Sequence, residues 1–413
     1  MKLTEDDIYR TSTQYRFWSF TKEQLAAQRL RTNAQATERV KANVARLRAQ
    51  RQQQADSDSV SSGVENGSGA NTPLPDRSSD LKEVDCLTAE EELKLVDEFC
   101  ERAVALGQHC NFAMEATATG VQFLRRFYLY NSPMTYHGQN ISRTTMFLAT
   151  KTENSHRPLD EFVANFGKVT REQILAPEYI VAQGLRFHLE VKHPFRGLKG
   201  AHLEIMGIAL GSYEGPNKID EGMTSADLQA RMLKLPSKSG RPVAMSAKDM
   251  EQRVNAAYVH ASNTLKKVAI LTDAYFLYTP SQIWLAAHLL ADEPLTLFHI
   301  SLKVSASSLT CTKLVSTIRS CAALLSSHHT YAPNPERDAK HRAEVKRLIE
   351  KLKSCRDPDK VDLVKLNQAQ KRDAVKEDGD GIELEESKAK RRKIERETYE
   401  KASNEFWGPE LKK

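Results

Sequence analysis

The side chains in this sequence that could catalyse a reaction or bind a metal are above all cysteines and histidines, and their spacing is informative. Six cysteines occur, and no two stand in the Cys-x-x-Cys arrangement that is typical of redox or zinc sites. The neighbours His328 and His329 follow Cys321 by seven and eight positions, which is not metal-ligand spacing, and we expect them to end a helix. The sequence contains no Gly-rich phosphate loop, Gly-x-Ser-x-Gly elbow or His-Glu-x-x-His motif. It therefore predicts no catalytic residues, no metal site and no cofactor.

Length and composition limit the class of protein. The chain has 413 residues, enough for two ordinary domains with extensions. The formal net charge of +6 is too small for this length to indicate nucleic-acid binding by itself. No apolar run approaches the ~18 residues of a membrane helix, and the N-terminus lacks a signal-peptide core. Cysteines without a disulfide or metal pattern are typical of reduced thiols, so we expect a soluble intracellular protein.

The elements that must position any site are helices, and the clearest one begins at Thr279. This residue can cap a helix, Pro280 suits its first position, and Gln282 completes a Thr-x-x-Gln capping box. Residues 281–293 then have no wide polar face, as expected for a helix enclosed by others. A similar central helix is predicted at 141–153, about 140 residues earlier, a period too long for a solenoid. Because strand signals are nearly absent, the sequence predicts an all-α fold of two tandem helical bundles.

Changes in composition divide the chain into six parts. A capping box at Thr21 and Gln24 opens a strongly basic helix with a thin apolar stripe, which we expect to lie along a larger body. A Ser/Gly/Asn/Asp-rich stretch follows and is typical of a flexible linker. The predicted parts are 1–54, the N-terminal aromatic segment and helix; 55–82, the linker; 83–192, the first bundle; 193–332, the second bundle, with a loop insertion at about 211–248; 333–357, a C-terminal helix; and 358–413, a charged tail expected to be disordered.

Five segments resemble the cyclin family, and within it the cyclin H type. They are QYRFWSF at 14–20, FLRRFYLYNSPMTYH at 123–137, FLATKTEN at 147–154, LRFHLEVKHPFRG at 185–197 and LTDAYFLYTPSQIWLA at 271–286. The last is the most specific, since it combines a turn, a cap and an aromatic pattern. The resemblance covers about 12–330 apart from the linker and the insertion, which depart from the compact family pattern. It implies that the two bundles are five-helix cyclin boxes.

The resemblance also implies a function. Cyclins are non-catalytic subunits that dock on the regulatory helix of a cyclin-dependent kinase and favour its active arrangement. The cyclin H type is similar to the cyclin of the CDK-activating kinase, whose complex contains a RING-finger assembly factor and belongs to transcription factor IIH. The implied role is therefore activation of a kinase that phosphorylates the RNA polymerase II C-terminal domain and other kinases, in transcription and cell-cycle control.

Two residues match the pair with which cyclins contact the kinase backbone. Lys151 stands in FLATKTE, where the family has the lysine that ends its third helix. Glu178 lies eleven residues before Leu189, the spacing that family members keep to their F-x-L ending. An ammonium suits clustered carbonyl groups, and a carboxylate suits backbone N–H groups. The resemblance implies that Lys151 and Glu178 bind the kinase, whereas without it each is more typical of a solvated helix-end charge.

Aromatic and basic residues outside the boxes support two further predictions. The aromatic residues Tyr15, Phe17 and Trp18 either pack on the first bundle or contact a partner, and the sequence favours neither. Trp284 is expected to be a core residue and not a ligand platform.

The run KAKRRK in the tail is a candidate nuclear import signal, so we expect a nuclear protein. Its basic residues are Lys388, Lys390, Arg391, Arg392 and Lys393.

Two alternative functions remain open. A cyclin C-like subunit of the Mediator type shares the aromatic N-terminus, although TDAYFLYTPSQI and the C-terminal helix favour the H type. General transcription factors of the IIB type use the same tandem boxes to bind promoter DNA. They would require a zinc ribbon ahead of the boxes, and the sequence has none. We therefore expect neither direct nucleic-acid binding nor a membrane partner.

Overall fold

The computed structural model describes residues 5–61, 84–214, 223–237, 245–305, 307–358, 363–365 and 368. Across these residues the regular structure is helical, and no strand occurs among them, as the sequence predicts. The chain divides into a unit from Met1 to Val361 and a second from Asp362 to Lys413. Only four residues of the second unit are described, all helical, so the following description concerns the first unit.

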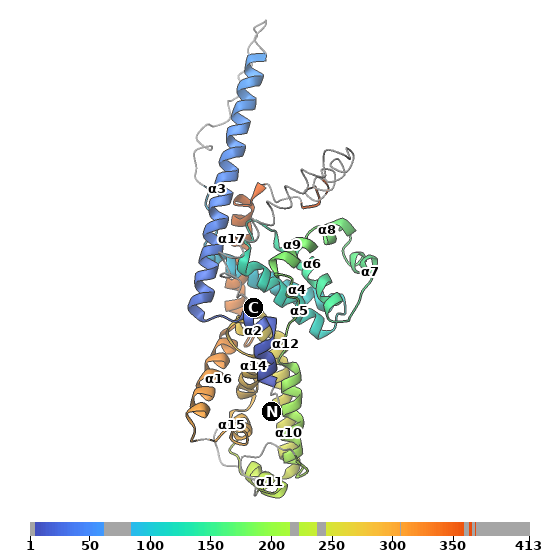
Figure 1. The fold of residues 1–413 in the computed structure, drawn as a ribbon, viewed down its shortest axis with the longest axis vertical. Coiled ribbons are helices and arrows are strands. Elements are labelled where there is room, and N and C mark those ends of the chain that lie inside the picture. The colour runs from blue at the N-terminus through green and yellow to red at the C-terminus, as the bar shows by residue number, and fades with distance from the viewer. Residues whose placement is uncertain are drawn as a thin grey trace, which may run out of the picture. The chain divides into compact units, whose positions relative to one another are not determined.

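The first bundle is built around two neighbouring helices, α5 (Met114–Tyr130) and α6 (Gly138–Thr152). α6 packs on α5 and on α4 (Ala89–His109), α8 (Arg171–Leu175) and α9 (Glu178–Gly184), which gives it the central place predicted for 141–153. α5 is equally central, because every residue from 116 to 129 is buried. α7 (Leu159–Ala164) completes this bundle. Figure 1 shows these helices as one group, in teal and green.

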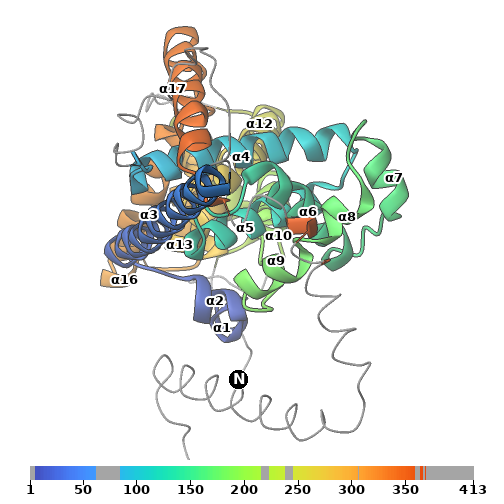
Figure 2. The same ribbon diagram turned by 90° about the horizontal axis from the view of Figure 1, so that it is seen from above.

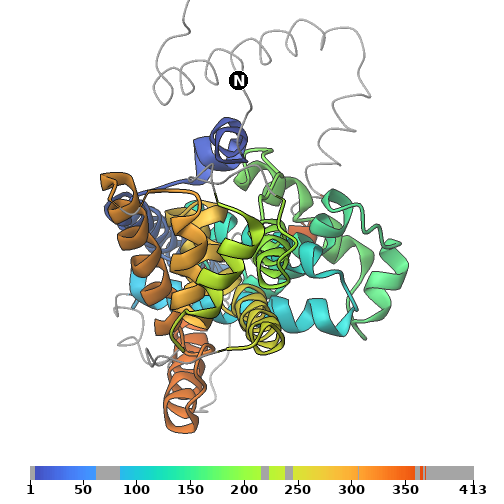
Figure 3. The ribbon, with the colours of Figure 1, turned by 90° about the horizontal axis from the view of Figure 1, so that it is seen from below.

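The second bundle encloses α14 (Pro280–Ala291), which packs against five other helices. The capping box predicted at its start is present: Thr279 accepts a hydrogen bond from the backbone of Gln282, whose side chain accepts one from the backbone of Thr279. Trp284 is buried, as predicted. Figure 3 views this bundle from below. Its other elements are α10 (Phe195–Ala209), α12 (Ala247–Lys267), η1 (Ala269–Leu271), α13 (Ala274–Leu277), α15 (Glu293–Ser301) and α16 (Leu309–Ser327).

The predicted insertion at 211–248 contains a helix of its own. α11 (Ser225–Leu233) starts with a capping box at Thr224 and packs on α10 through the buried side chains of Leu228 and Met232. The sequence predicted an insertion in a loop and did not indicate the helix within it, which has one buried face because of the apolar spacing of these two residues.

The helical extensions lie against the bundles. α1 (Glu5–Thr11) and α2 (Thr13–Trp18) precede the long α3 (Lys22–Ser61), whose capping box at Thr21 is present. α3 runs seven residues past position 54, because neither glycine nor proline interrupts it before Gly63. The rest of the predicted linker, residues 62–82, lies outside the described residues. α17 (Pro335–Ser354) packs on α4, and Figure 2 shows α17, α3 and α4 together.

Candidate functional site

The two residues that the resemblance singles out lie together in the fold. Lys151 is in the last turn of α6 and Glu178 is the first residue of α9, since α8 ends just before Pro177. The Lys151 Nζ atom donates to Glu178 Oε1 at 2.5 Å and also lies 4.6 Å from the centre of the Phe147 ring. Both side chains remain partly open, at 38% and 28% exposure. They form an oriented, accessible ion pair, and its use as a partner contact stays a prediction.

Exposed apolar side chains occur in the same stretch of chain as Glu178, at the end of α8, in α9 and just after it. Leu175, Tyr179 and Phe187 are 41%, 68% and 61% exposed. The rings of Tyr179 and Phe187 lie 6.2 Å apart, and Phe187 adopts a positive φ of 58°, which bulky residues rarely do. Large exposed apolar groups beside a pair of charges are typical of a protein interface. The sequence contains these residues in LAPEYIVAQGLRF, but helical spacing alone does not reveal that they face outward.

The N-terminal aromatic residues divide between packing and exposure. Trp18 is fully buried, beneath the Arg126 guanidinium at 5.0 Å and against the Tyr130 ring. Phe17 stacks on His188 with ring centres 4.4 Å apart. Tyr15 is 40% exposed. Trp18 therefore anchors the segment on the first bundle, and Tyr15 is the member of the predicted set that is open to a partner.

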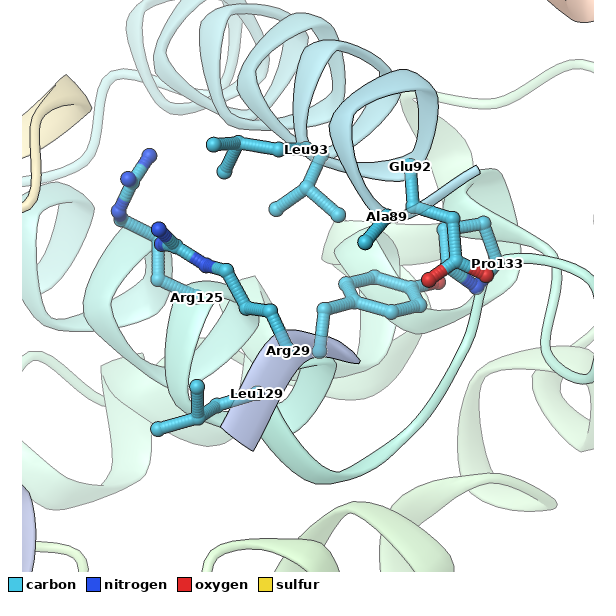
Figure 4. Close-up of a pocket in the computed structure, with 9 residues that line it drawn as sticks. Arg29, Ala89, Glu92, Leu93, Arg125, Leu129 and Pro133 are labelled. Atoms are coloured by element: carbon cyan, nitrogen blue, oxygen red, sulfur yellow. The ribbon is translucent and has the colours of Figure 1, made fainter. Parts of the chain in front are cut away.

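A buried network of charges, which the sequence did not indicate, joins α3 to both bundles. Arg125 of α5 donates to Asp97 of α4 at 2.7 Å and to Asp273 of the second bundle at 2.6 Å. Arg29 of α3 donates to both oxygens of the same Asp273 carboxylate, at 2.6 and 2.8 Å. Figure 4 shows the two guanidinium groups on one side of a small cavity. One carboxylate therefore holds arginines from two different parts of the chain.

Burial and the neighbouring arginines shift the pKa values of the two carboxylates in this network in opposite directions. Burial alone would raise the pKa of Asp273, but the charges and hydrogen bonds of Arg125 and Arg29 outweigh it and hold that pKa well below the usual range. Burial raises the pKa of Asp97, against the attraction of Arg125. The cavity measures about 20 Å³, roughly the space of one water molecule, which is too small for a substrate or cofactor. The charged network therefore stabilises the packing of α3 against both bundles.

Another side chain that lines this cavity, Glu92, gives the fold a pH dependence. Burial raises its pKa from 4.5 to about 7, although hydrogen bonds from Ser132 and Asn33 lower it. Between these pH values the folded chain keeps a proton that the unfolded chain loses, so rising pH destabilises the fold by up to ~3 kcal/mol through this group. Glu92→Gln should remove that loss. Urea unfolding of both proteins at several pH values from 4.5 to 7 measures it, and parallel curves would contradict the assignment.

Two predictions concern other regions of the chain. The candidate import signal at Lys388, Lys390, Arg391, Arg392 and Lys393 lies outside the described residues. None of the helices in the described part of the chain combines the length and apolar character that a membrane crossing requires.

Comparison with known proteins identifies both bundles. The family model for the cyclin N-terminal domain matches residues 94–190, and the one for the cyclin C-terminal domain matches residues 193–326. Cyclin CCL1 of Saccharomyces cerevisiae is 30% identical over 304 residues, which cover 73% of this chain and 62% of that protein. Cyclin mcs2 of Schizosaccharomyces pombe is 34% identical, covering 48% and 54%. Cyclin-H of Xenopus laevis is 29% identical, with the same coverage. The chain thus spans less than two thirds of each relative's length.

A solved structure agrees with these sequence matches. The chain is similar to one in the structure of the CAK complex from Chaetomium thermophilum bound to ATP-gamma-S, with a TM-score of 0.65 and 29% sequence identity. The similarity covers 91% of this chain and 96% of that one. The predicted all-α fold with two tandem boxes is therefore confirmed.

Proposed function

The chain belongs to the cyclin family, and on this basis we propose that it is the non-catalytic subunit that activates a cyclin-dependent kinase of the CDK-activating type. The observation that carries the proposal is the accessible ion pair of Lys151 and Glu178 together with the exposed apolar side chains of Leu175, Tyr179 and Phe187. Such a surface offers an ammonium to carbonyl groups and a carboxylate to N–H groups of a partner backbone, beside apolar area that the partner would bury.

Activation would follow from preferential binding. A protein kinase is active when its β3 lysine pairs with the glutamate of the regulatory helix and its magnesium-binding aspartate is in place. A subunit that binds this arrangement more tightly than the inactive one shifts the kinase population toward it. The cyclin needs no catalytic group of its own.

The similarity to cyclin H and to a chain of a CAK complex supports a particular complex in which this subunit would act. We include as partners a RING-finger assembly factor and the core of transcription factor IIH. The resulting kinase would phosphorylate the RNA polymerase II C-terminal domain, and the protein would act in the nucleus.

Co-purification with candidate kinases tests the proposal. The isolated chain should phosphorylate nothing, and it should bind and stimulate the kinase of a CDK-activating complex. A Mediator-type kinase recovered in its place would support the cyclin C-like alternative. Tight binding to duplex DNA at physiological salt, with no kinase bound, would support a factor of the IIB type and contradict the proposal.

A further inference from the structure

Four side chains that are distant in sequence converge beside α4. Glu101 comes from α4, His328 and His329 from the C-terminal end of α16, and His341 from α17. The ligand atoms of Glu101, His328 and His329 all lie within 4.8 Å of one another, and Glu101 forms a second such group with His341 and Glu98. His328 is the C-cap of α16, so the sequence prediction of a helix end is correct. The fold nevertheless gathers residues whose spacing along the chain suggests no metal site.

The atoms that face one another in this cluster are poorly satisfied as hydrogen-bonding groups. Glu101 Oε1 is buried and lies 3.0 Å from His329 Nε2, an ion pair when that imidazole is protonated, and it makes no hydrogen bond with the other described residues. His341 Nε2 is also buried without a hydrogen-bond partner. Buried polar atoms are normally paired, so two that converge on one spot indicate a missing electrophilic partner.

The surroundings favour a cation bound by imidazole. His328 Nδ1 lies 2.8 Å from Thr330 Oγ1 and 3.4 Å from the Thr330 backbone nitrogen, so Nε2 is a ligand atom in the tautomer whose Nδ1–H donates to the hydroxyl, as in metal sites whose histidines are oriented by an outer hydrogen bond. The carboxylates of Glu98 and Asp338 lie near Glu101, although Arg102 pairs with Glu98 at 2.6 Å and Arg337 lies near both histidines. The His328 and His329 rings are adjacent, with centres 4.6 Å apart.

We propose that Glu101, His328 and His329 bind a divalent transition metal of the zinc class, with His341 as the fourth ligand. Imidazole nitrogens with one carboxylate oxygen are a zinc donor set, whereas magnesium and calcium prefer oxygen ligands throughout. His341 shares a ligand group with Glu101, and its ring centre lies 4.4 Å from that of His329, so it is placed to complete a four-ligand set. The bound metal would fasten the end of α16 and the helix α17 to α4, so that it ties the second box and the C-terminal helix to the first box.

Zinc binding by the full-length chain, without a histidine tag and stripped with a chelator, tests the proposal. Titration with zinc chloride should show one strong site per chain and a higher Tm with zinc than without. The variants E101Q and H329Q should each weaken binding at least tenfold. His109→Gln, which changes an exposed histidine of the same helix α4, is the matched control and should bind as the wild type does.

Cobalt(II) distinguishes this site from the cysteines. Cobalt in the wild-type chain should give the visible absorption of a four-coordinate nitrogen and oxygen site without a thiolate charge-transfer band, and zinc should displace it. Circular dichroism without metal checks that each variant is folded. A charge-transfer band, or equal zinc binding by the wild type and the E101Q/H328Q/H329Q variant, would overturn the proposal. The wild-type spectrum distinguishes the two kinds of site even if a variant does not fold.

Discussion

Exchanging the charges of Lys151 and Glu178 should reduce kinase stimulation at least tenfold and leave the fold intact. In the variant K151E/E178K the carboxylate and the ammonium change places, so the internal ion pair of 2.5 Å can form again. Partner groups placed to meet the original charges would now be repelled. Disrupting close charged contacts in an interface costs about 2–5 kcal/mol, and 1.4 kcal/mol is already tenfold in affinity. Kinase activity measured against the concentration of the chain separates affinity from maximal stimulation.

The chain offers a matched control for this exchange. Arg157 and Glu161 form an exposed ion pair of 3.0 Å in the first box, and R157E/E161R should stimulate the kinase normally. The single variant K151E completes the set. If K151E loses stimulation and the double exchange restores it, the pair acts only as an internal brace. The assignment of Lys151 and Glu178 to the kinase contact would then be wrong, although the proposed function could stand.

Asp273→Ala should lower the free energy of unfolding by about 3–5 kcal/mol, the usual effect of removing one partner from a buried ion pair. The substitution leaves Arg125, which is 4% exposed, with Asp97 as its remaining carboxylate, and it leaves Arg29 without its two short hydrogen bonds. Water cannot readily replace the lost carboxylate around a guanidinium that is so deeply buried. Urea unfolding followed by circular dichroism measures the change.

An exposed pair in the second bundle provides the comparison. Arg319 and Glu293 lie 2.8 Å apart but are 58% and 47% exposed, so Arg319→Ala should change stability by less than about 1 kcal/mol. Similar losses in D273A and R319A would show that the network contributes no more than an ordinary surface pair.

Features that depend on neighbouring residues were predictable from the sequence. The capping boxes at Thr21 and Thr279 need only a hydroxyl and an amide three residues later, and both are present. The all-α class followed in the same way from helical periodicity. The family resemblance singled out Lys151 and Glu178 as a kinase contact, but neither it nor their separation of 27 residues predicted that the two side chains form an ion pair with each other.

Features that depend on distant residues were not predictable. Asp273 stands in the most specific segment of the sequence, yet its arginine partners lie 148 and 244 residues away. The burial of α5 was also hidden, because its sequence contains Gln122 and Arg125, polar residues that hydrogen-bond to the backbone carbonyls of Ile270 and Leu271 in the fold. The cluster of Glu101 and the three histidines was not predictable either. Its residues are polar, and they come from α4, the end of α16 and α17, which lie far apart in the chain.

The single carboxylate of Asp273 also determines when the first box can finish folding during synthesis. A ribosome that adds about 5–20 residues per second reaches Asp273 roughly 7–30 s after Arg125, because 148 residues separate them. During that interval the Arg125 guanidinium has only Asp97 as a carboxylate partner, and Arg29 has yet to meet its own. The first box therefore leaves the ribosome without one of its carboxylate partners, and translation of the second box supplies that partner, Asp273. A message truncated between the boxes would yield a first box in which Arg125 and Arg29 lack the Asp273 carboxylate.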